Sequence, residues 1–392
     1  MRILIVHNTL NDSRSVSGVL RHYAWMANEW IAAGHPTDFI VARAGFPQLQ
    51  SLAPKSRLIS SDDWFDATRY IAQTWRYFPA YAWRMATAHW LRLPDQYDLV
   101  YSSTQLIVEV YAAMILASRA RAKFVAKIHH VLAAQKRRGG FFDRLFLWSE
   151  RKTMRWMNQH ADLLICGTPL VAEDFHALER TLGLPRRETI QIGYGVDLEA
   201  MPLAANRRKR FDVVVLGRLH EHKGVFDLPH VWREVLQHRP HSHLLVIGEG
   251  PHRPRVESIF QQMGIDQSVT FTGGIEETEK NKMLCESRIG LSLSFEEGWG
   301  LSINEFLAAR LPVVAYDLPI YAHVFPEQID LVPPGDRIGI AKKLLALLDN
   351  EQRQEAQGLR GREFVRRYDF RNVASQELAA LKELISQPAP PE

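Results

Sequence analysis

The chain has 392 residues, of which 46% are hydrophobic and 23% are charged. This length favours two domains over one, and the composition is that of an ordinary globular protein able to bury two cores. The 48 basic and 44 acidic side chains give a formal charge of +4, which is compatible with an anionic small molecule, a lipid surface or nucleic acid and selects none of them.

The two cysteines are far apart and have no metal-type spacing. Neither a disulfide framework nor a cysteine-based zinc site is therefore expected, and a reducing, cytoplasmic location fits. The opening "MRILIVHNTL" turns polar too soon for a secretory signal and is typical of a first strand. Residues 99–118 come nearest to a membrane span, but Glu109 and several uncharged polar residues interrupt them, so they predict a strand followed by a helix.

Short apolar runs rich in β-branched residues alternate with segments of helical period along the chain. In the first half these runs lie at residues 2–7, 38–43, 98–103, 123–130, 161–167 and 189–195. In the second half they lie at residues 211–217, 242–250, 268–274, 288–294, 312–317 and 330–334. Nearly continuous apolar strands separated by helices predict parallel sheets covered on both faces. The expected fold class is α/β, with two doubly wound domains.

A boundary is predicted near "LAANRRKR", residues 203–210, because a small, polar and basic stretch suits a surface linker. The predicted domains are 1–203 and 204–371, and the final helix is expected at about 372–386. Ligands of open parallel sheets bind beyond the carboxyl ends of the strands. A cleft between two such domains is therefore the expected site.

The strand at 211–216 runs into the loop "GRLHEHKGV". Gly217 permits a tight turn, and Arg218 and Lys223 precede the next helix. Two cations beside a helix start can neutralise a phosphate, because the helix end adds free N–H groups and partial positive charge. Arginine and lysine in a loop are also common as solvated surface residues, so the loop alone leaves both interpretations open.

The strand at 288–294 leads into "EEGWGLSINEFLAAR", where Gly298 and Gly300 permit a turn and a helix is predicted from about Ser302. Glu297 then lies in the loop and Glu305 one turn into the helix. Carboxylates accept strong hydrogen bonds from sugar hydroxyls, and free amides at a helix start can bind a diphosphate between them. The free amides at the helix start are those of Gly300, Leu301 and Ser302. Alternatively, Glu305 complements the helix dipole and Glu297 is a surface residue.

Five motifs in sequence order resemble family 4 retaining glycosyltransferases. "FEEGWGLSINEFLAARLPVVAYD" resembles the E-x7-E signature of that family, and "GRLHEHKG" resembles its G-R-x-x-x-x-K-G loop. "SVSGVLRHYAWMANEWIAAGH", "KFVAKIHH" and "IQIGYGVDLE" resemble its N-terminal glycine loop, the strand ending in its active-site histidine, and its N-G-V-D turn. The resemblance covers residues 1–45 and 95–375.

The resemblance implies the GT-B architecture, in which two Rossmann-like domains face each other across a cleft. The first domain is implied to bind the acceptor and the second a nucleoside diphosphate sugar. Glu297 is implied to bind hydroxyls of the donor sugar and Glu305 the ribose, while Arg218 and Lys223 neutralise the leaving diphosphate. His129 is implied to lie beside the transferred sugar. The full implied donor-binding set is Gly18, Gly217, Arg218, Lys223, Glu297, Gly298, Trp299, Gly300, Leu301, Ser302 and Glu305.

The same resemblance implies transfer with retention of anomeric configuration and without a metal or other cofactor, and no D-x-D string occurs in a fitting place. Because neighbouring strand residues point to opposite faces, only one of His129 and His130 is expected to line the cleft, and the family register favours His129. The chain also departs from the family pattern. Ser17, Tyr194, Trp299, Ser302 and Arg310 replace a glycine, an asparagine, a phenylalanine, a proline and a glycine, respectively.

Two segments of the first half, 64–93 and 134–160, combine aromatic with basic residues. They predict either docking on an anionic membrane surface or an aromatic core beneath a solvated basic face, and the sequence leaves both open. The acceptor is expected to be a glycan, a lipid-linked molecule or a small molecule, in the synthesis of cell-surface polysaccharide or glycolipid. Nucleic-acid binding is not expected, because no recognised motif is present.

Two other functions on the same fold stay open at this point. One is a non-catalytic protein that binds sugar nucleotides, and the other is a sugar-nucleotide epimerase. A dinucleotide oxidoreductase is not expected, because the first strand runs into "HNTLNDSRSVSG" instead of G-x-G-x-x-G.

Overall fold

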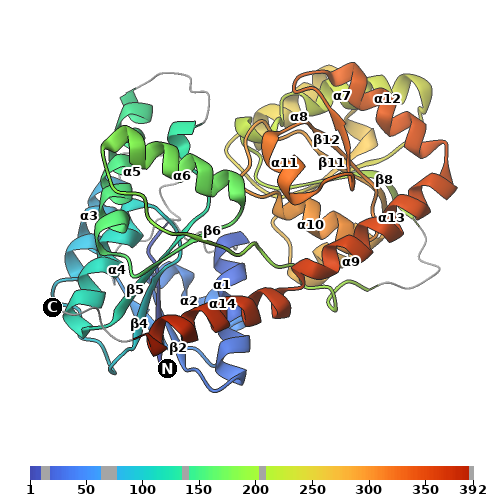
Figure 1. Ribbon diagram of the computed structural model, residues 1–392. Coiled ribbons are helices and arrows are strands. Elements are labelled where there is room, and N and C mark those ends of the chain that lie inside the picture. Colours follow the sequence, from blue (N-terminus) through green and yellow to red (C-terminus); the bar gives the residue numbers. More distant parts are fainter. Residues whose placement is uncertain (10–17, 63–76, 135–140, 203–208, 388–392) are drawn as a thin grey trace. The chain divides into compact units, whose positions relative to one another are not determined.

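The structure is a computed structural model that describes residues 1–9, 18–62, 77–134, 141–202 and 209–387. The chain forms two compact units (Figure 1). Unit 1 consists of Met1–Gly195 together with Phe370–Glu392, and unit 2 is Val196–Asp369.

The chain passes from unit 1 to unit 2 between Gly195 and Val196, earlier than the predicted boundary between residues 203 and 204. The reason is that Val196 is buried and its N–H donates to the carbonyl of Tyr368, at 2.8 Å, within unit 2. Most of the basic stretch that suggested the boundary, residues 203–208, lies outside the described residues.

Unit 1 contains a seven-stranded sheet in which all neighbouring strands are parallel. The strand order is β3-β2-β1-β4-β5-β6-β7. The strands are β1 (Ile3–His7), β2 (Thr37–Val41), β3 (Leu58–Ser60), β4 (Leu99–Ser102), β5 (Lys123–Ile128), β6 (Leu163–Cys166) and β7 (Ile190–Gln191). All but β3 coincide with predicted strands; β3 is short and only partly buried, so it carries too weak an apolar run to be recognised.

Helices cover both faces of this sheet, because side chains alternate along each strand. Ile3 and Ile5 pack with α1, α2 and α14, whereas Leu4 and Val6 pack with α4, α5 and α6. The C-terminal helix α14 therefore belongs to unit 1 and lies against α1 (Figure 1). The α-helices of the unit are α1 (Gly18–Ala32), α2 (Phe46–Leu52), α3 (Tyr77–Thr87), α4 (Ile107–Ala120), α5 (Phe141–His160), α6 (Pro169–Leu182) and α14 (Phe370–Ser386).

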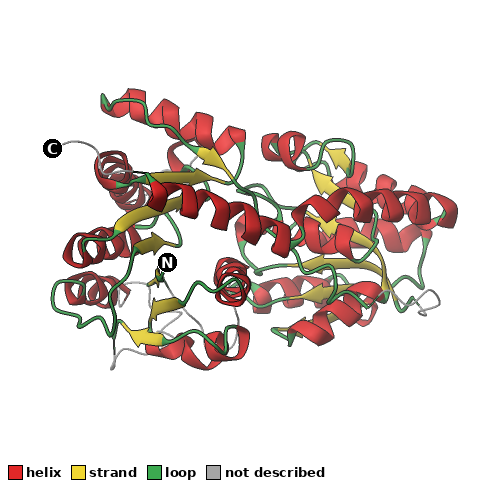
Figure 2. Ribbon diagram, turned by 60° about the horizontal axis from the view of Figure 1, so that its bottom comes forward, coloured by secondary structure: helices red, strands yellow, loops and turns green. Residues whose placement is uncertain are grey.

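Unit 2 contains a six-stranded parallel sheet in the order β10-β9-β8-β11-β12-β13. Its strands are β8 (Phe211–Leu216), β9 (Leu244–Ile247), β10 (Val269–Gly273), β11 (Ser287–Ser292), β12 (Val313–Tyr316) and β13 (Asp330–Val332). Its α-helices are α7 (Leu228–His238), α8 (Arg253–Gln262), α9 (Glu277–Cys285), α10 (Leu301–Ala308), α11 (Pro319–Val324), α12 (Arg337–Leu348) and α13 (Glu351–Val365). In each unit the strands form a layer between helices (Figure 2).

The predicted fold class, two doubly wound parallel sheets of the Rossmann-like type, is confirmed. In each sheet the strand order reverses direction once, between β1 and β4 in unit 1 and between β8 and β11 in unit 2. Such a switch point is where ligands of this fold class bind, because the loops after its two strands diverge. The loops after β8 and β11 are those that carry the predicted cations and acids.

Candidate functional site

The loops after β8 and β11 lie side by side, because these two strands are paired neighbours in the sheet. The N–H of Phe295 donates to the carbonyl of His222, at 2.8 Å. Gly224 has φ 68°, and a Cβ at this position would overlap the carbonyl oxygen of Leu293. Glycine at position 224 therefore lets the lysine-bearing loop lie directly on the acid-bearing loop.

Lys223 and Glu297 form one ion pair across this junction. The Lys223 Nζ lies 2.5 Å from Glu297 Oε1, and the Ser294 hydroxyl donates to the same oxygen at 2.8 Å. The lysine side chain is 27% exposed and the glutamate 11%, so the pair is mostly buried but still reached by solvent. The predicted cation Lys223 and the predicted acid Glu297 are thus in direct contact.

Arg218 lies in the same loop but is exposed, and its guanidinium has no partner among the described residues. Gly217 precedes it with φ 153°, and a Cβ at Gly248 would overlap the Gly217 carbonyl. The ends of β8 and β9 are therefore closely packed, and Arg218 projects from a fixed point of the sheet edge with its charge uncompensated by any described side chain.

The helix that carries Glu305 starts at Leu301, one residue before the prediction. Gly300 precedes it in the left-handed conformation, with φ 102° and ψ 50°, and provides no side-chain cap. The N–H groups of Leu301 and Ser302 find no acceptor in the described part of the chain. Together with the half-exposed Gly298, this helix start leaves the donor groups that an anion could use.

Glu305 is held by a residue that the sequence analysis did not identify. Lys280, on α9, places its Nζ 2.6 Å from Glu305 Oε1 and 2.5 Å from Glu277 Oε1, and its side chain is only 4% exposed. No local pattern relates Lys280 to the E-x7-E segment, because the contact depends on how α9 packs beside α10. Trp299, predicted to bind the donor, is buried and makes a T-shaped contact with Tyr368, with ring centroids 5.0 Å apart.

His129 belongs to unit 1, where β5 ends at Ile128, so the predicted strand to residue 130 is too long. The strand stops because the Gln105 side chain takes the place of a neighbouring strand as hydrogen-bond partner. Its oxygen accepts from the His129 N–H at 3.1 Å, and its Nε2 donates to the His130 carbonyl at 2.8 Å. His129 is buried and His130 only partly so.

Both ring nitrogens of His129 are engaged inside the protein. Nε2 donates to the Ser103 carbonyl at 2.6 Å, and Nδ1 accepts from the Tyr194 hydroxyl at 2.5 Å. Burial lowers the pKa of His129 to about 3, so the ring is neutral near pH 7.

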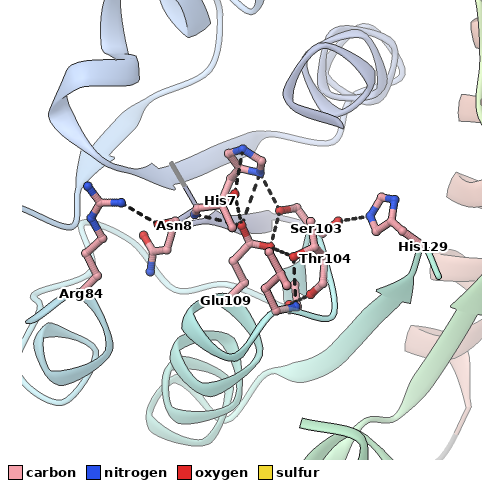
Figure 3. A network of polar contacts seen from close by, with 10 residues as sticks. His7, Asn8, Arg84, Ser103, Thr104, Glu109 and His129 are labelled. Atoms are coloured by element: carbon pink, nitrogen blue, oxygen red, sulfur yellow. Dashed lines mark hydrogen bonds and ion pairs between the residues drawn. The ribbon is translucent and has the colours of Figure 1, made fainter. Parts of the chain in front are cut away.

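A buried polar network adjoins His129 at the carboxyl ends of β1 and β4 (Figure 3). Its centre is the fully buried Glu109, whose carboxylate accepts from the hydroxyls of Ser103 and Thr104 and from Thr9. His7 Nδ1 lies 2.8 Å from the Ser103 hydroxyl, and burial lowers the pKa of His7. The predicted Gly18 starts α1 and is exposed, while the rest of its glycine loop lies outside the described residues.

The structure thus brings Arg218, Lys223, Glu297, Glu305 and the α10 start to one edge of the unit 2 sheet, and it places His129 and Gly18 in unit 1. Across residues 1–9, 18–62, 77–134, 141–202 and 209–387, no three His, Cys, Asp or Glu side chains gather as a metal site would require. Within those same ranges, no helix is long and apolar enough to cross a bilayer.

The sequence matches two family descriptions that together cover most of the chain. "Glycosyltransferase Family 4" matches residues 16–200, and "Glycosyl transferases group 1" matches residues 201–364. The chain is 32% identical over 202 residues to phosphatidyl-myo-inositol mannosyltransferase of Mycobacterium leprae, covering 48% of this chain and 52% of that protein. It is 24% identical over 296 residues to sulfoquinovosyl transferase SQD2 of Arabidopsis thaliana, covering 71% and 55%. The chain thus spans about half the length of the curated relatives it matches.

Solved structures of similar fold cover nearly the whole chain. Anabaena Alr3699/HepE, solved with UDP-glucose, superposes with a TM-score of 0.75 at 17% identity, over 98% of this chain and 100% of that one. Sucrose-phosphate synthase from Thermosynechococcus elongatus superposes with a TM-score of 0.78 at 18% identity, over 98% and 99%. At such identities the likeness establishes the fold, which is GT-B. With its E-x7-E segment and both halves matched, the chain belongs to glycosyltransferase family 4.

Proposed function

We propose that the protein moves a sugar from a nucleoside diphosphate sugar to an acceptor hydroxyl, with retention of configuration and without a divalent cation. The observation that carries this proposal is the convergence of Arg218, Lys223, Glu297 and the open α10 start on the β8–β11 edge. Cations and helix N–H groups stabilise a departing diphosphate, and a nearby carboxylate accepts hydrogen bonds from sugar hydroxyls.

In the proposed reaction, the bond between the anomeric carbon and the diphosphate oxygen breaks, and the acceptor oxygen bonds to the same face of that carbon. The acceptor's proton goes to the departing phosphate oxygen. Arg218 and Lys223 stabilise the negative charge that develops on the diphosphate, Glu297 orients the donor sugar, and Glu305 holds the ribose. No protein nucleophile is assigned.

The test compares Glu297→Gln with Glu296→Gln, an exposed neighbour in the same loop. A thermal-shift screen of nucleoside diphosphate sugars, UDP-glucose included, first identifies the donor. Glu297→Gln should then lower kcat/KM for transfer by about 10²–10³-fold, whereas Glu296→Gln should leave it unchanged. Equal activity of the two variants would contradict the assignment.

Three further measurements separate the finer parts of this proposal. Product NMR should show the anomeric configuration of the donor; an inverted anomer would exclude retention. Activity should survive a chelator, and a loss that Mg²⁺ restores would exclude metal independence. Binding of a donor without transfer or hydrolysis would indicate a non-catalytic protein, and conversion of the donor without an acceptor would indicate an epimerase.

We further propose a lipid-linked acceptor and docking on the anionic cytoplasmic face of a membrane, in glycolipid or cell-surface polysaccharide synthesis. Two relatives are named as phosphatidyl-myo-inositol mannosyltransferase and alpha-monoglucosyldiacylglycerol synthase, which supports a lipid acceptor. On α5, Phe146 and Trp148 are 51% and 53% exposed, and Lys152 Nζ lies 5.9 Å from the Trp148 ring centroid. The same helix carries four exposed basic residues: Arg144, Arg151, Lys152 and Arg155.

An aromatic and basic helix face of this kind suits the interface of anionic lipids. In the other predicted segment, 64–93, residues 64–76 lie outside the described residues. Its Arg84 is buried and paired with Asp62, whereas Trp83 and Trp90 are exposed. Flotation with vesicles containing phosphatidylserine should recover the wild type and lose Trp148→Ala, while Leu359→Ala, an exposed apolar residue of unit 2, should behave as wild type. Failure of the wild type to bind such vesicles at low salt would exclude the docking face.

A further inference from the structure

Tyr194 stands where the family pattern has asparagine, and it is bound to the predicted active-site histidine. The tyrosine is 2% exposed. Its hydroxyl lies 2.5 Å from His129 Nδ1, and the two rings are stacked with centroids 5.1 Å apart and an interplanar angle of 26°. The contact therefore restrains both the position and the tilt of the imidazole.

The hydrogen bonds at the two ring nitrogens select one tautomer of His129. The Ser103 carbonyl, 2.6 Å from Nε2, can only accept, so Nε2 carries the proton. Nδ1 is then the acceptor for the Tyr194 hydroxyl. With Nδ1 and Nε2 both occupied, the ring is a fixed neutral dipole and has no free lone pair with which to take a proton from an acceptor.

Tyr194 is in turn held by a buried charge pair. Lys127 Nζ lies 4.7 Å from the centroid of the Tyr194 ring, and 2.8 Å from Glu377 Oε2, with both charged side chains 0% exposed. The hydroxyl of Tyr101 donates to Glu377 at 2.6 Å. Glu377 belongs to α14, so the C-terminal helix contributes to fixing the ring beside His129.

We infer that Tyr194 is a positioning residue, which holds His129 in a single orientation and as a neutral imidazole, so that the ring does not act as a general base. This inference rests on the proposed function, in which His129 lies beside the transferred sugar. It fits the proposed route of the acceptor's proton to the departing phosphate oxygen. An asparagine at position 194 has no aromatic ring and could not make this stacked contact.

The charged and titratable groups around the His129 ring define its response to pH. They are His7, His22, Lys127, His130 and Tyr194. Burial lowers the pKa of His129, and the cationic Lys127 acts in the same direction. Removing the Tyr194 hydroxyl removes a donor that stabilises the neutral ring, so the pKa of His129 should rise.

The experiment compares Tyr194→Phe with Tyr97→Phe. Tyr97 is a matched control, because it is equally buried in unit 1 and its hydroxyl donates to Asp38 at 2.7 Å, away from His129. Tyr194→Phe should lower kcat about 10- to 100-fold with little change in the KM for donor, and the acid limb of its kcat profile should move to higher pH. Tyr97→Phe should change neither.

Two outcomes would overturn the inference. One is a wild-type kcat and pH profile in Tyr194→Phe, and the other is an equal loss of kcat in both variants, which would mean a structural role only. A second readout does not depend on catalysis. Nitrogen-15 NMR of the His129 ring, assigned by difference from His129→Asn, should show a protonated Nε2 and a bare Nδ1 in the wild type. If the wild type transfers no sugar, a changed Nδ1 signal in Tyr194→Phe but not in Tyr97→Phe supports the positioning role, and an unchanged signal or the opposite wild-type tautomer refutes it.

Discussion

Replacing Lys280 with methionine tests the part of the site that sequence reasoning missed. Lys280 Nζ is 2.5 Å from Glu277 Oε1 and 2.6 Å from Glu305 Oε1, and its side chain is nearly inaccessible. Methionine has a similar length but no charge, so Lys280→Met preserves most of the packing. It leaves two carboxylates facing each other across the position of the lost ammonium.

The size of the effect follows from this geometry. Two oxygens that share one ammonium lie within about 5 Å of each other, where like charges repel by about 3 kcal/mol at an effective dielectric constant near 20. Removing one partner of a buried ion pair typically costs about 3–5 kcal/mol. These two energies estimate the same loss of stability and are not added together. The loss is smaller than either estimate for a fully buried pair, because the Glu277 side chain is 28% exposed. We therefore expect unit 2 to lose about 2–4 kcal/mol of its free energy of unfolding.

The assay is urea unfolding followed by hydrogen exchange of peptides from unit 2, with Lys282→Met as the control. Lys282 lies on the same helix but is exposed, so its replacement should change stability by no more than about 0.5 kcal/mol. Equal stabilities of the two variants at neutral pH would refute the reasoning.

Three other predictions concern stability. Gly224→Ala should cost at least about 3 kcal/mol and Gly264→Ala about 1 kcal/mol in urea unfolding, because both residues have φ 68° but only a Cβ at 224 would overlap a neighbouring carbonyl; equal losses would contradict the close approach of the two loops. Glu377→Gln should cost about 3–5 kcal/mol, since it leaves its buried lysine partner uncompensated, and a loss below about 1 kcal/mol would be inconsistent with this. Acidification below pH 6.5 should destabilise unit 1, because burial lowers the pKa of His22 and His129 in the folded state and only the unfolded chain then takes up protons. The expected slope is about 1.4 kcal/mol per pH unit for each residue, and His22→Gln should flatten it; an unchanged slope would argue against a buried neutral His22.

The strands of both sheets could be predicted because each is a nearly continuous apolar run that is covered on two faces. The prediction failed where this signal fades. The strand β3 is short and partly buried, and β5 stops at Ile128 because the Gln105 side chain takes over the backbone hydrogen bonds of the next residues. The domain crossing was placed too late, because Val196 already pairs within unit 2 although no polar linker marks the change.

The loop residues of the candidate site could be proposed from the sequence because their spacing along the chain is short and resembles the family pattern. Arg218 and Lys223 lie in one loop, and Glu297 and Glu305 lie on either side of one turn. The residues that hold them come from elsewhere in the fold. Lys280 reaches Glu305 from α9, and this contact has no counterpart in any local pattern.

The spacing of the two acids has a physical explanation in the unliganded protein. Each carboxylate of the E-x7-E segment is already paired with a lysine from a different element, Glu297 with Lys223 and Glu305 with Lys280. A partly buried carboxylate without a partner would raise the cost of folding this loop. The pairs orient both carboxylates and restrict the Lys223 side chain before any ligand arrives, so less conformational freedom remains to be lost on binding. Arg218 differs, because it has no partner in the described parts of the chain. It is therefore the cation whose charge a diphosphate can neutralise without breaking an existing pair, and of the two predicted cations its loss should weaken donor binding more.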